Sequence, residues 1–283
     1  MDVFQAVLKS GELSERVLSL TEEVIAVNAS NYNAWEVRWR CVEVLPDSLM
    51  EKEADFLDQM LMNNPKNYQL WNYRRRFAFH RGADYTAEEL AYVRRCLDQD
   101  AKNYHAWAHR VAVAEKFNLW ERELDDLSRL LELDLRNNSA WNHRFVAASY
   151  LARQGNAEQV FQSELLYTRA LILKAPHNES SWNYLRGLCT ALGLPHKMSL
   201  EPSVATLCLE VLQQKSSCSL ALECLADIYT EQSRLLEASK QDDAAATAAT
   251  LGIQCFKELE VTDPIRQNFW RQRQVELLSV PNA

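Results

Sequence analysis

The residues best suited to chemistry form two similar groups, one repeat apart in the sequence. Each group has an ammonium, an amide and a phenol in consecutive positions: Lys66, Asn67 and Tyr68, then Lys102, Asn103 and Tyr104 with His105. If each group begins a helix, unpaired N–H groups and the helix dipole there favour an anion. Two adjacent helix starts could then span a diphosphate. The alternative is that the lysines are solvated and aromatic rings pack on their stems.

A longer motif positions these groups. An Asn stands four residues before a Trp in five places: Asn31 and Trp35, Asn67 and Trp71, Asn103 and Trp107, Asn137 and Trp141, Asn178 and Trp182. An Arg follows the Trp by three residues in the first four copies, at Arg38, Arg74, Arg110 and Arg144, whereas the fifth has Leu185. The successive Trp spacings are 36, 36, 34 and 41 residues. A period in this range indicates a stacked repeat array.

The three motif residues have a structural interpretation that needs no ligand. The Asn can cap a helix, because its side chain can accept a hydrogen bond from a backbone N–H two or three residues on. The Trp is large enough to fill the groove between adjacent repeats. The Arg lies on the same side of the helix and can reach a carboxylate of the next helix.

Composition predicts an all-α fold. The chain of 283 residues is 47% hydrophobic and 25% charged, with six Gly, too few for the turns of an all-β chain. The seven Pro fall between periodic segments. We expect one domain over residues 1–283, a right-handed α–α superhelix of helical hairpins. Its repeats are recognisable over about residues 30–190 and diverge over 195–283.

Local signals predict where several helices begin and end. Gly11 should separate a short helix from a longer one within residues 2–27. Two sequences, Ser48 to Glu51 and Thr86 to Glu89, have the form of a capping box. Residues 239–250 are Ala-rich and polar, which leaves a loop and a surface helix both open.

Charge and cysteine content exclude several classes of function. The net charge is −8, so we expect no nucleic-acid partner. No apolar run reaches the ~18 residues of a membrane helix and no signal peptide precedes the repeats, so we expect a cytoplasmic protein. The seven Cys form no C-x-x-C pair and should be buried, reduced thiols. No Ser-His-Asp set or Gly-rich phosphate loop is present, so the chain lacks complete catalytic machinery of its own.

These residues carry a resemblance to a known family. The five Asn-to-Trp repeats are similar to those of protein prenyltransferase α subunits. Residues 65–71 and 100–107, which read PKNYQLW and DAKNYHAW, resemble the α subunit shared by protein farnesyltransferase and type I geranylgeranyltransferase. Residues 136–142 (RNNSAWN) and 176–184 (PHNESSWNY) support the likeness. It covers nearly the whole chain and is strongest over residues 13–190.

The resemblance implies a crescent of helical hairpins that wraps around a β subunit. In this family the β subunit holds the catalytic zinc and most of the isoprenoid pocket, and magnesium is a possible second ion. The zinc activates the cysteine of a C-terminal CaaX sequence as a thiolate. The thiolate attacks C1 of farnesyl or geranylgeranyl diphosphate. CaaX proteins, the prenyl diphosphate and the β subunit are therefore the implied partners.

The resemblance also implies roles for single residues. Lys66 and Tyr104 are the implied catalytic residues. Lys66 matches a lysine that neutralises charge on the departing diphosphate, and Tyr104 and His105 match positions near that diphosphate. Tyr68 matches an aromatic beside the lysine, and Gln69 matches a residue that binds the terminal carboxylate of the peptide. Asn103 and Tyr32 match further family positions, for which a structural role is the stronger interpretation.

Two other interpretations stay open from the sequence. The α subunit of Rab geranylgeranyltransferase usually carries extra domains, whereas this chain ends at Ala283, so it is disfavoured. A non-catalytic scaffold of the tetratricopeptide type would need small residues where this chain has Trp and Arg. The Pro-rich N-terminal extension usual in the family is missing here, which affects the expected regulation or solubility and leaves the expected site unchanged.

Overall fold

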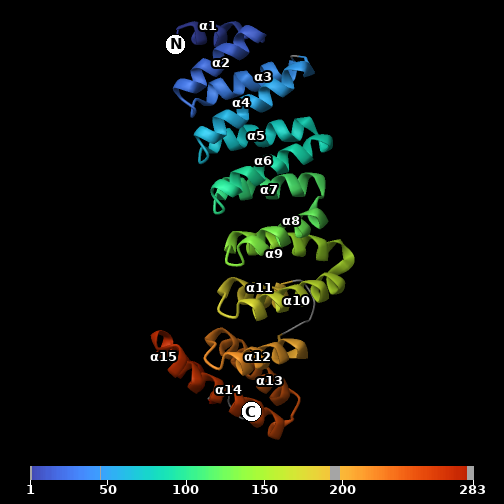
Figure 1. The fold of residues 1–283 in the computed structure, drawn as a ribbon, viewed down its shortest axis with the longest axis vertical. Coiled ribbons are helices and arrows are strands. Elements are labelled where there is room, and N and C mark those ends of the chain that lie inside the picture. Colours follow the sequence, from blue (N-terminus) through green and yellow to red (C-terminus); the bar gives the residue numbers. More distant parts are fainter. Residues whose placement is uncertain (1, 45, 192–197, 279–283) are drawn as a thin grey trace. The chain divides into compact units, whose positions relative to one another are not determined.

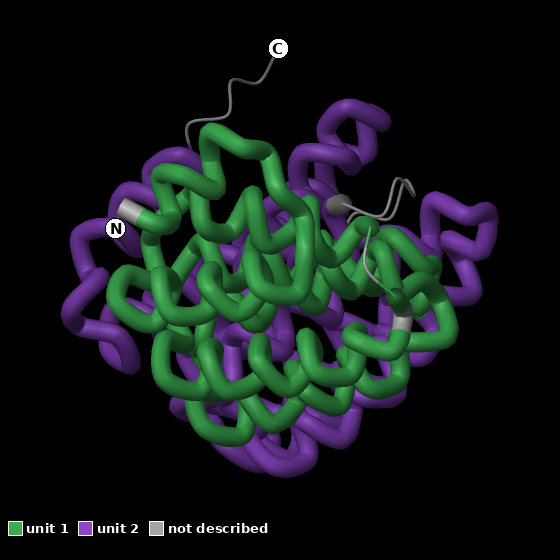
Figure 2. The backbone as a smooth tube through the Cα atoms, turned by 90° about the horizontal axis from the view of Figure 1, so that it is seen from above, with its two compact units in different colours: residues 1–120 green, residues 121–283 purple. Residues whose placement is uncertain are grey.

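The computed structural model describes residues 2–44, 46–191 and 198–278. Within these ranges the chain forms helices and turns without a β-strand, which confirms the all-α prediction. The helices group into two compact units, residues 1–120 and residues 121–283 (Figure 2). None of the helices in the described ranges has the length and apolar character needed to cross a membrane.

Unit 1 holds the helices that carry both groups of candidate residues. Its elements are α1 (Asp2–Ser10), α2 (Glu15–Val27), α3 (Tyr32–Val44), η1 (Asp47–Leu49), α4 (Met50–Asn63), α5 (Tyr68–Arg81), η2 (Ala83–Tyr85), α6 (Thr86–Gln99) and α7 (Tyr104–Phe117). Helices that begin at the Asn-to-Trp motif pack on one another, α3 on α5 and α5 on α7 (Figure 1). The break predicted at Gly11 separates α1 from α2, and Gly11 has a left-handed φ of 68°.

Unit 2 continues the series of helices, beginning within α8. Its elements are α8 (Trp120–Leu133), α9 (Asn138–Leu151), η3 (Ala152–Asn156), α10 (Ala157–Lys174), α11 (Glu179–Ala191), η4 (Met198–Leu200), α12 (Pro202–Gln214), α13 (Ser219–Ala238), α14 (Asp242–Thr262), η5 (Pro264–Arg266) and α15 (Gln267–Leu278). Most of the polar stretch 239–250 is the first part of α14, so the helical alternative holds there.

The Asn residues of the first four motif copies cap their helices as predicted. The Oδ1 atom of Asn67 accepts hydrogen bonds from the backbone N–H groups of Gln69 at 2.8 Å and Leu70 at 3.2 Å. Asn103 and Asn137 make the same pair of bonds at α7 and α9. Each cap satisfies backbone donors that would otherwise lack a partner in the first turn.

A backbone carbonyl connects successive repeats, which the sequence did not indicate. The indole Nε1 of Trp71 donates to the carbonyl of Pro65 at 2.8 Å, and the side-chain amide of Asn103, one repeat later, donates to the same oxygen at 3.2 Å. The carbonyls of Ala29 and Leu135 are shared in the same way by the Trp of their own repeat and the Asn of a following one. We call these three the shared carbonyls. They fix each helix start to the preceding repeat.

The pattern extends one repeat beyond the last Trp motif. The carbonyl of Pro176 accepts from Trp182 Nε1 at 2.8 Å and from the Sγ of Cys218 at 3.4 Å. Cys218 occupies the N-cap position of α13. A thiol therefore takes the place of the Asn amide, and Leu222 stands four residues later, where a Trp would be. At the start of α13 the divergent C-terminal region therefore keeps this contact with different side chains.

Buried carboxylates bind the motif arginines, as predicted. Three pairs join an Arg to the Glu of the following helix through two nitrogens: Arg38 with Glu53, Arg74 with Glu89, and Arg144 with Glu164. The same carboxylates also bind a side chain of the next repeat, from Tyr73 to Glu53, His109 to Glu89 and Tyr184 to Glu164. Each Glu thus bridges two repeats.

The two predicted capping boxes are wrong. The N-cap residues of α4 and α6 are Leu49 and Tyr85, neither of which makes a side-chain capping bond. Short 3₁₀ turns precede both helices. The Thr86 hydroxyl donates to the carbonyl of Ala83 at 2.8 Å. Glu89 is fully buried and pairs with Arg74. Glu89 therefore forms the interior salt bridge with Arg74 and does not cap α6.

The cysteine prediction is confirmed. All seven Cys lie in the described ranges, and each is free and buried. Burial raises the pKa of the Cys189 thiol to about 12, so that thiol is not ionised at neutral pH. These side chains behave as small apolar residues of the core.

Candidate functional site

The first turns of α3, α5 and α7 form the candidate site. Each of the three helices begins with a Tyr, and the three side chains are strongly exposed: Tyr32 at 69%, Tyr68 at 72% and Tyr104 at 70%. The residues stand 36 apart, and their helices pack in sequence within unit 1. The repeat therefore places three phenol side chains along the starts of adjacent helices, as the sequence predicted for Tyr68 and Tyr104.

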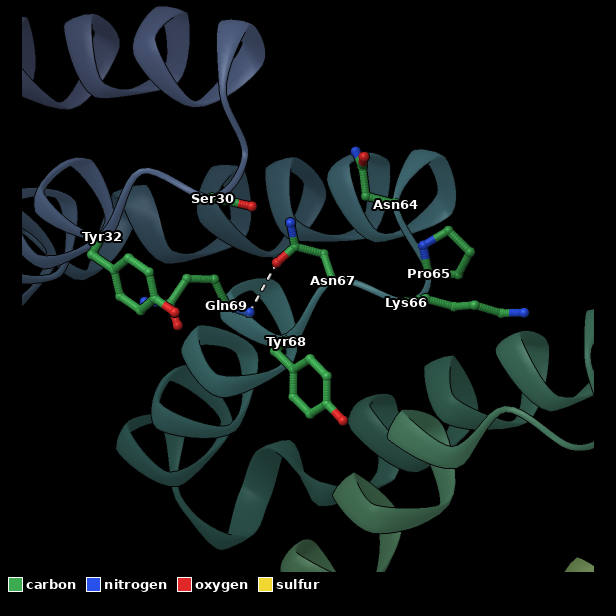
Figure 3. Close-up of a pocket in the computed structure, with 8 residues that line it drawn as sticks. All are labelled: Ser30, Tyr32, Asn64, Pro65, Lys66, Asn67, Tyr68 and Gln69. Carbon is green, nitrogen blue, oxygen red and sulfur yellow. Dashed lines mark hydrogen bonds between the residues drawn. The ribbon is translucent and has the colours of Figure 1, made fainter.

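A first depression of about 550 Å³ lies between the start of α3 and the start of α5 (Figure 3). Its lining residues are Ser30, Tyr32, Asn64, Pro65, Lys66, Asn67, Tyr68 and Gln69. The Gln69 side chain extends toward Tyr32, whereas Lys66 extends away from it (Figure 3). The Asn67 cap and the Pro65 carbonyl, which holds Trp71, fix the backbone on both sides of Lys66.

Lys66 has only a weak ionic partner. Its Nζ lies 3.9 Å from the Oδ2 of Asp100, and the two side chains are 78% and 44% exposed. An exposed pair at this distance contributes little, because water screens the charges and the flexible chains lose entropy. The ammonium group is therefore available to an anion that enters the depression.

A second depression, of about 370 Å³, lies between α5 and α7. Its lining residues are Tyr68, Gln69, Trp71, Asn72, Arg75, Tyr104, His105, Ala108 and His109. It shares Tyr68 and Gln69 with the first depression, so the two adjoin. The ring of Tyr68 meets that of His105 edge to face, with centroids 4.3 Å apart and planes at 90°. This contact orients both side chains at the boundary.

The electrostatics of the two depressions favour an anion. Among the described residues that line them there is no Asp or Glu, whereas Lys66 and Arg75 supply permanent positive charge. Desolvation by burial lowers the pKa of His105, which favours a neutral imidazole at pH 7. A neutral ring offers one N–H donor and an apolar face. The arrangement can bind an oxyanion between helix starts and aromatic walls.

The predicted site residues lie in three places, which are the first depression, the second depression and the buried turn before α7. Lys66, Tyr32, Tyr68 and Gln69 line the first depression. Two others, Tyr104 and His105, line the second beside Tyr68 and Gln69.

Asn103 differs from the other predicted residues, because it is 3% exposed and lines neither depression. Its amide bonds His105 N, Ala106 N and the Pro65 carbonyl. Asn103 therefore holds the turn that carries Tyr104 and His105.

Sequence reasoning missed Asn72 and Arg75, which line the second depression. Both follow Gln69 at intervals of three residues, which places them on one face of α5. That helical spacing was the available signal. It was obscured because Arg74, Arg75 and Arg76 are adjacent in sequence, and the motif assigns an interior role to Arg74 without telling which of the other two lines a depression.

The chain provides no evident metal centre in the part that the structure describes. No group of three or more His, Cys, Asp or Glu side chains there is arranged to hold a metal ion.

Comparison with known families matches four segments of the chain. The family described as "Protein prenyltransferase alpha subunit repeat" matches residues 50–81, 86–117, 120–151 and 161–192. In the first two of these segments the match covers the helix pairs α4 with α5 and α6 with α7. These pairs carry Lys66, Tyr68, Tyr104 and His105.

Relatives with assigned names align with almost the whole chain. The protein farnesyltransferase/geranylgeranyltransferase type-1 subunit alpha of Pisum sativum is 38% identical, over 98% of this chain and 84% of the relative. The protein of the same name from Arabidopsis thaliana is 39% identical, over 98% of this chain and 86% of its own length. A solved structure, Candida albicans protein geranylgeranyltransferase-I complexed with GGPP, superimposes with a TM-score of 0.78 at 29% identity. The superposition covers 97% of this chain and 88% of the other.

Proposed function

The chain belongs to the family of protein farnesyltransferase/geranylgeranyltransferase type-1 α subunits, and we propose that it acts as the α subunit of a heterodimeric protein prenyltransferase. The enzyme transfers a farnesyl or geranylgeranyl group from the prenyl diphosphate to the cysteine of a C-terminal CaaX sequence. The observation that carries the proposal is the pair of adjoining depressions whose described lining residues include no Asp or Glu, the first of them lined by the exposed Lys66. The relatives reported above do not favour the Rab-type subunit or the scaffold.

Lys66 is the residue to which we assign the main catalytic contribution of this chain. As the bond between C1 and the diphosphate oxygen breaks, negative charge grows on the departing diphosphate. An ammonium already held near that oxygen stabilises the charge without reorganisation. Asn67 and the shared carbonyl of Pro65 fix the backbone next to Lys66, so the repeat sets the point from which this side chain extends.

The neighbouring polar side chains complete the proposed substrate contacts. Tyr104 and His105 lie at the second depression, where their O–H and N–H groups can donate to diphosphate oxygens. Gln69 reaches both depressions and can donate its amide to the terminal carboxylate of the peptide. Tyr68 and Tyr32 contribute aromatic walls beside them. Asn103 acts indirectly, by fixing the first turn of α7.

Zinc belongs to the partner subunit in this proposal, where it activates the substrate thiol as thiolate. The charged and polar residues of this chain that line the two depressions are a lysine, an arginine, phenols, amides, imidazoles and a serine, and no Asp, Glu or Cys is among the described lining residues. This donor set suits an anion better than a zinc ion. Omission and restoration of magnesium in the assay tests whether that ion assists the diphosphate.

The deciding experiment is co-expression of the chain with type-1 farnesyltransferase and geranylgeranyltransferase β subunits. Gel filtration measures heterodimer formation, and transfer is measured with peptides ending in C-a-a-S, C-a-a-M and C-a-a-L. We expect a stable heterodimer that prenylates at least one peptide class. A chain that forms no heterodimer, or a heterodimer without transfer to any of these peptides, would contradict the proposal.

A further inference from the structure

Three consecutive arginines of α5 face three different environments. Arg74 is buried and bonds both Glu89 and Asp58. Arg76 pairs with Glu36 at 2.9 Å and lies over the ring of Trp39. Arg75 lines the second depression, and its Nη2 donates to the Oδ1 of Asn72 at 3.0 Å. Of the three, Arg75 is the one without an ionic partner among the described residues.

The surroundings of Arg75 leave its charge uncompensated. An amide oxygen accepts one of the five N–H donors of the guanidinium and carries no net charge. The residues that line the same depression include no Asp or Glu within the described part of the chain. The fork of a guanidinium fits the two oxygens of a carboxylate or phosphate. A planar cation in this setting is suited to an oxyanion from outside the chain.

The position of Arg75 connects it with the proposed substrate contacts. The second depression also holds Tyr104 and His105, and it shares Tyr68 and Gln69 with the depression of Lys66. Gln69 and Arg75 project from the same helix at positions i and i+6, and Asn72 between them holds the guanidinium. An anion that enters the second depression can therefore reach Gln69, Tyr104 and Arg75.

We propose that Arg75 is a further substrate-binding residue, whose guanidinium contacts an oxyanion of a substrate in the depression between α5 and α7. The inference rests on the proposed transferase function. Two substrate groups have this chemistry, the terminal carboxylate of the acceptor peptide and the diphosphate of the prenyl donor. An acidic side chain of the partner subunit is the competing occupant.

The test uses the assembled heterodimer with three variants. Arg75→Gln removes the charge, and Arg75→Lys keeps the charge without the fork. The matched control is Arg40→Gln, because Arg40 is an exposed arginine of α3 that lines neither depression. One arm compares KM for a CaaX peptide with a free carboxylate and with a terminal amide. The other measures Kd for the prenyl diphosphate without peptide, and gel filtration follows heterodimer assembly.

We expect Arg75→Gln to raise one constant by roughly tenfold to a hundredfold, since a charged hydrogen-bond partner is lost. A rise in KM for the free-carboxylate peptide alone identifies the carboxylate, and a rise in Kd identifies the diphosphate. Arg75→Lys should recover part of the loss, and Arg40→Gln should match the wild type. Unchanged constants overturn the inference. So does weaker assembly with normal constants in the assembled enzyme, which makes Arg75 a subunit contact.

Failure of this inference differs from failure of the proposed function. If the wild-type heterodimer transfers no prenyl group, the proposed function is wrong and the inference falls with it. If the wild type is active and Arg75→Gln binds both substrates normally, only the role of Arg75 is wrong.

Discussion

At the scale of single residues, replacing Lys66 should affect the reaction and leave the stability of the fold unchanged. We expect Lys66→Ala to lower the single-turnover rate of the heterodimer by about 10²–10³, the usual effect of losing one preorganised charge or donor at a developing anion. Its thermal midpoint should stay that of the wild type, because the side chain is 78% exposed and its one ion pair is long. Single-turnover kinetics beside thermal melting test both parts.

Lys52→Ala is the matched control for Lys66→Ala, because Lys52 is an exposed lysine of α4 outside both depressions. It should leave rate and melting unchanged. A full single-turnover rate in Lys66→Ala would remove the catalytic role of Lys66. Early melting of that variant would show that the lysine supports the fold instead.

The role of a side chain was predictable from the sequence where the residue type itself indicates the kind of group that it binds. Asn67 as a cap and Arg74 as the partner of a carboxylate follow from helical geometry and charge. The shared carbonyl of Pro65 was not predictable, because every residue has such an oxygen and only the fold selects one. Arg75 needed the structure to distinguish it from its two neighbours.

At the scale of elements, the buried carboxylates connect one repeat to the next. Glu89 joins Arg74 of its own repeat to His109 of the following one. Burial opposes ionisation of Glu89, but the charge and hydrogen bonds of Arg74 and His109 prevail and hold its pKa at about 2, below the ordinary 4.5. The ionised form is therefore stabilised in the folded protein.

Glu89→Gln should lower the free energy of unfolding by ~3 kcal/mol at neutral pH, because it removes the buried anion of Arg74 and leaves only the partly exposed Asp58 to pair with it. A lowered carboxyl pKa contributes stability above the unfolded value of 4.5, and this contribution is lost as pH falls toward about 2. The difference between wild type and variant should therefore shrink over that interval. Urea unfolding at a series of pH values measures it.

Glu88→Gln provides the control for the interior pair, because Glu88 is its exposed neighbour on α6. It should cost less than about 0.5 kcal/mol, as surface substitutions usually do. If Glu89→Gln is as mild as Glu88→Gln, the bridge between repeats contributes no net stability.

Helix starts at the Trp motif were predictable, whereas starts of the intervening helices were less so. The Asn at each motif has one strong local use, so α5 and α7 begin where expected. At Glu89 a local capping role competed with a buried partner fifteen residues earlier, and the distant partner prevailed. Single-sequence patterns weigh local bonds alone, which is why the capping box at Thr86 to Glu89 was wrong.

At the scale of the whole molecule, the proposal makes this chain one half of an enzyme. The chain purified without a β subunit should transfer no prenyl group and should hold less than stoichiometric zinc. The residues at the candidate site supply positive charge and hydrogen-bond donors, and the thiol still needs activation from elsewhere. Elemental analysis and a transfer assay on the isolated chain test this. One tightly held zinc per chain, or transfer without a partner, would contradict it.

The family and the fold were accessible from the sequence because the repeat recurs five times with the same Asn and Trp. The two adjoining depressions were only partly predictable from the sequence. Lys66 and Tyr104 were found through the motif, but the common walls formed by Tyr68 and Gln69 depend on how α3, α5 and α7 pack. That packing lies beyond what residue spacing specifies.

The thiol at Cys218 has a dynamic consequence for the last third of the chain. Sulfur is a weak donor and acceptor, so the contact from Cys218 to the Pro176 carbonyl holds the start of α13 less firmly than an amide would. Hydrogen–deuterium exchange should therefore be faster for the first-turn amides of α13 than for those of α5 or α7. Cys218→Asn should slow that exchange. This result would identify the start of α13 as a site of local opening that precedes global unfolding of the repeats.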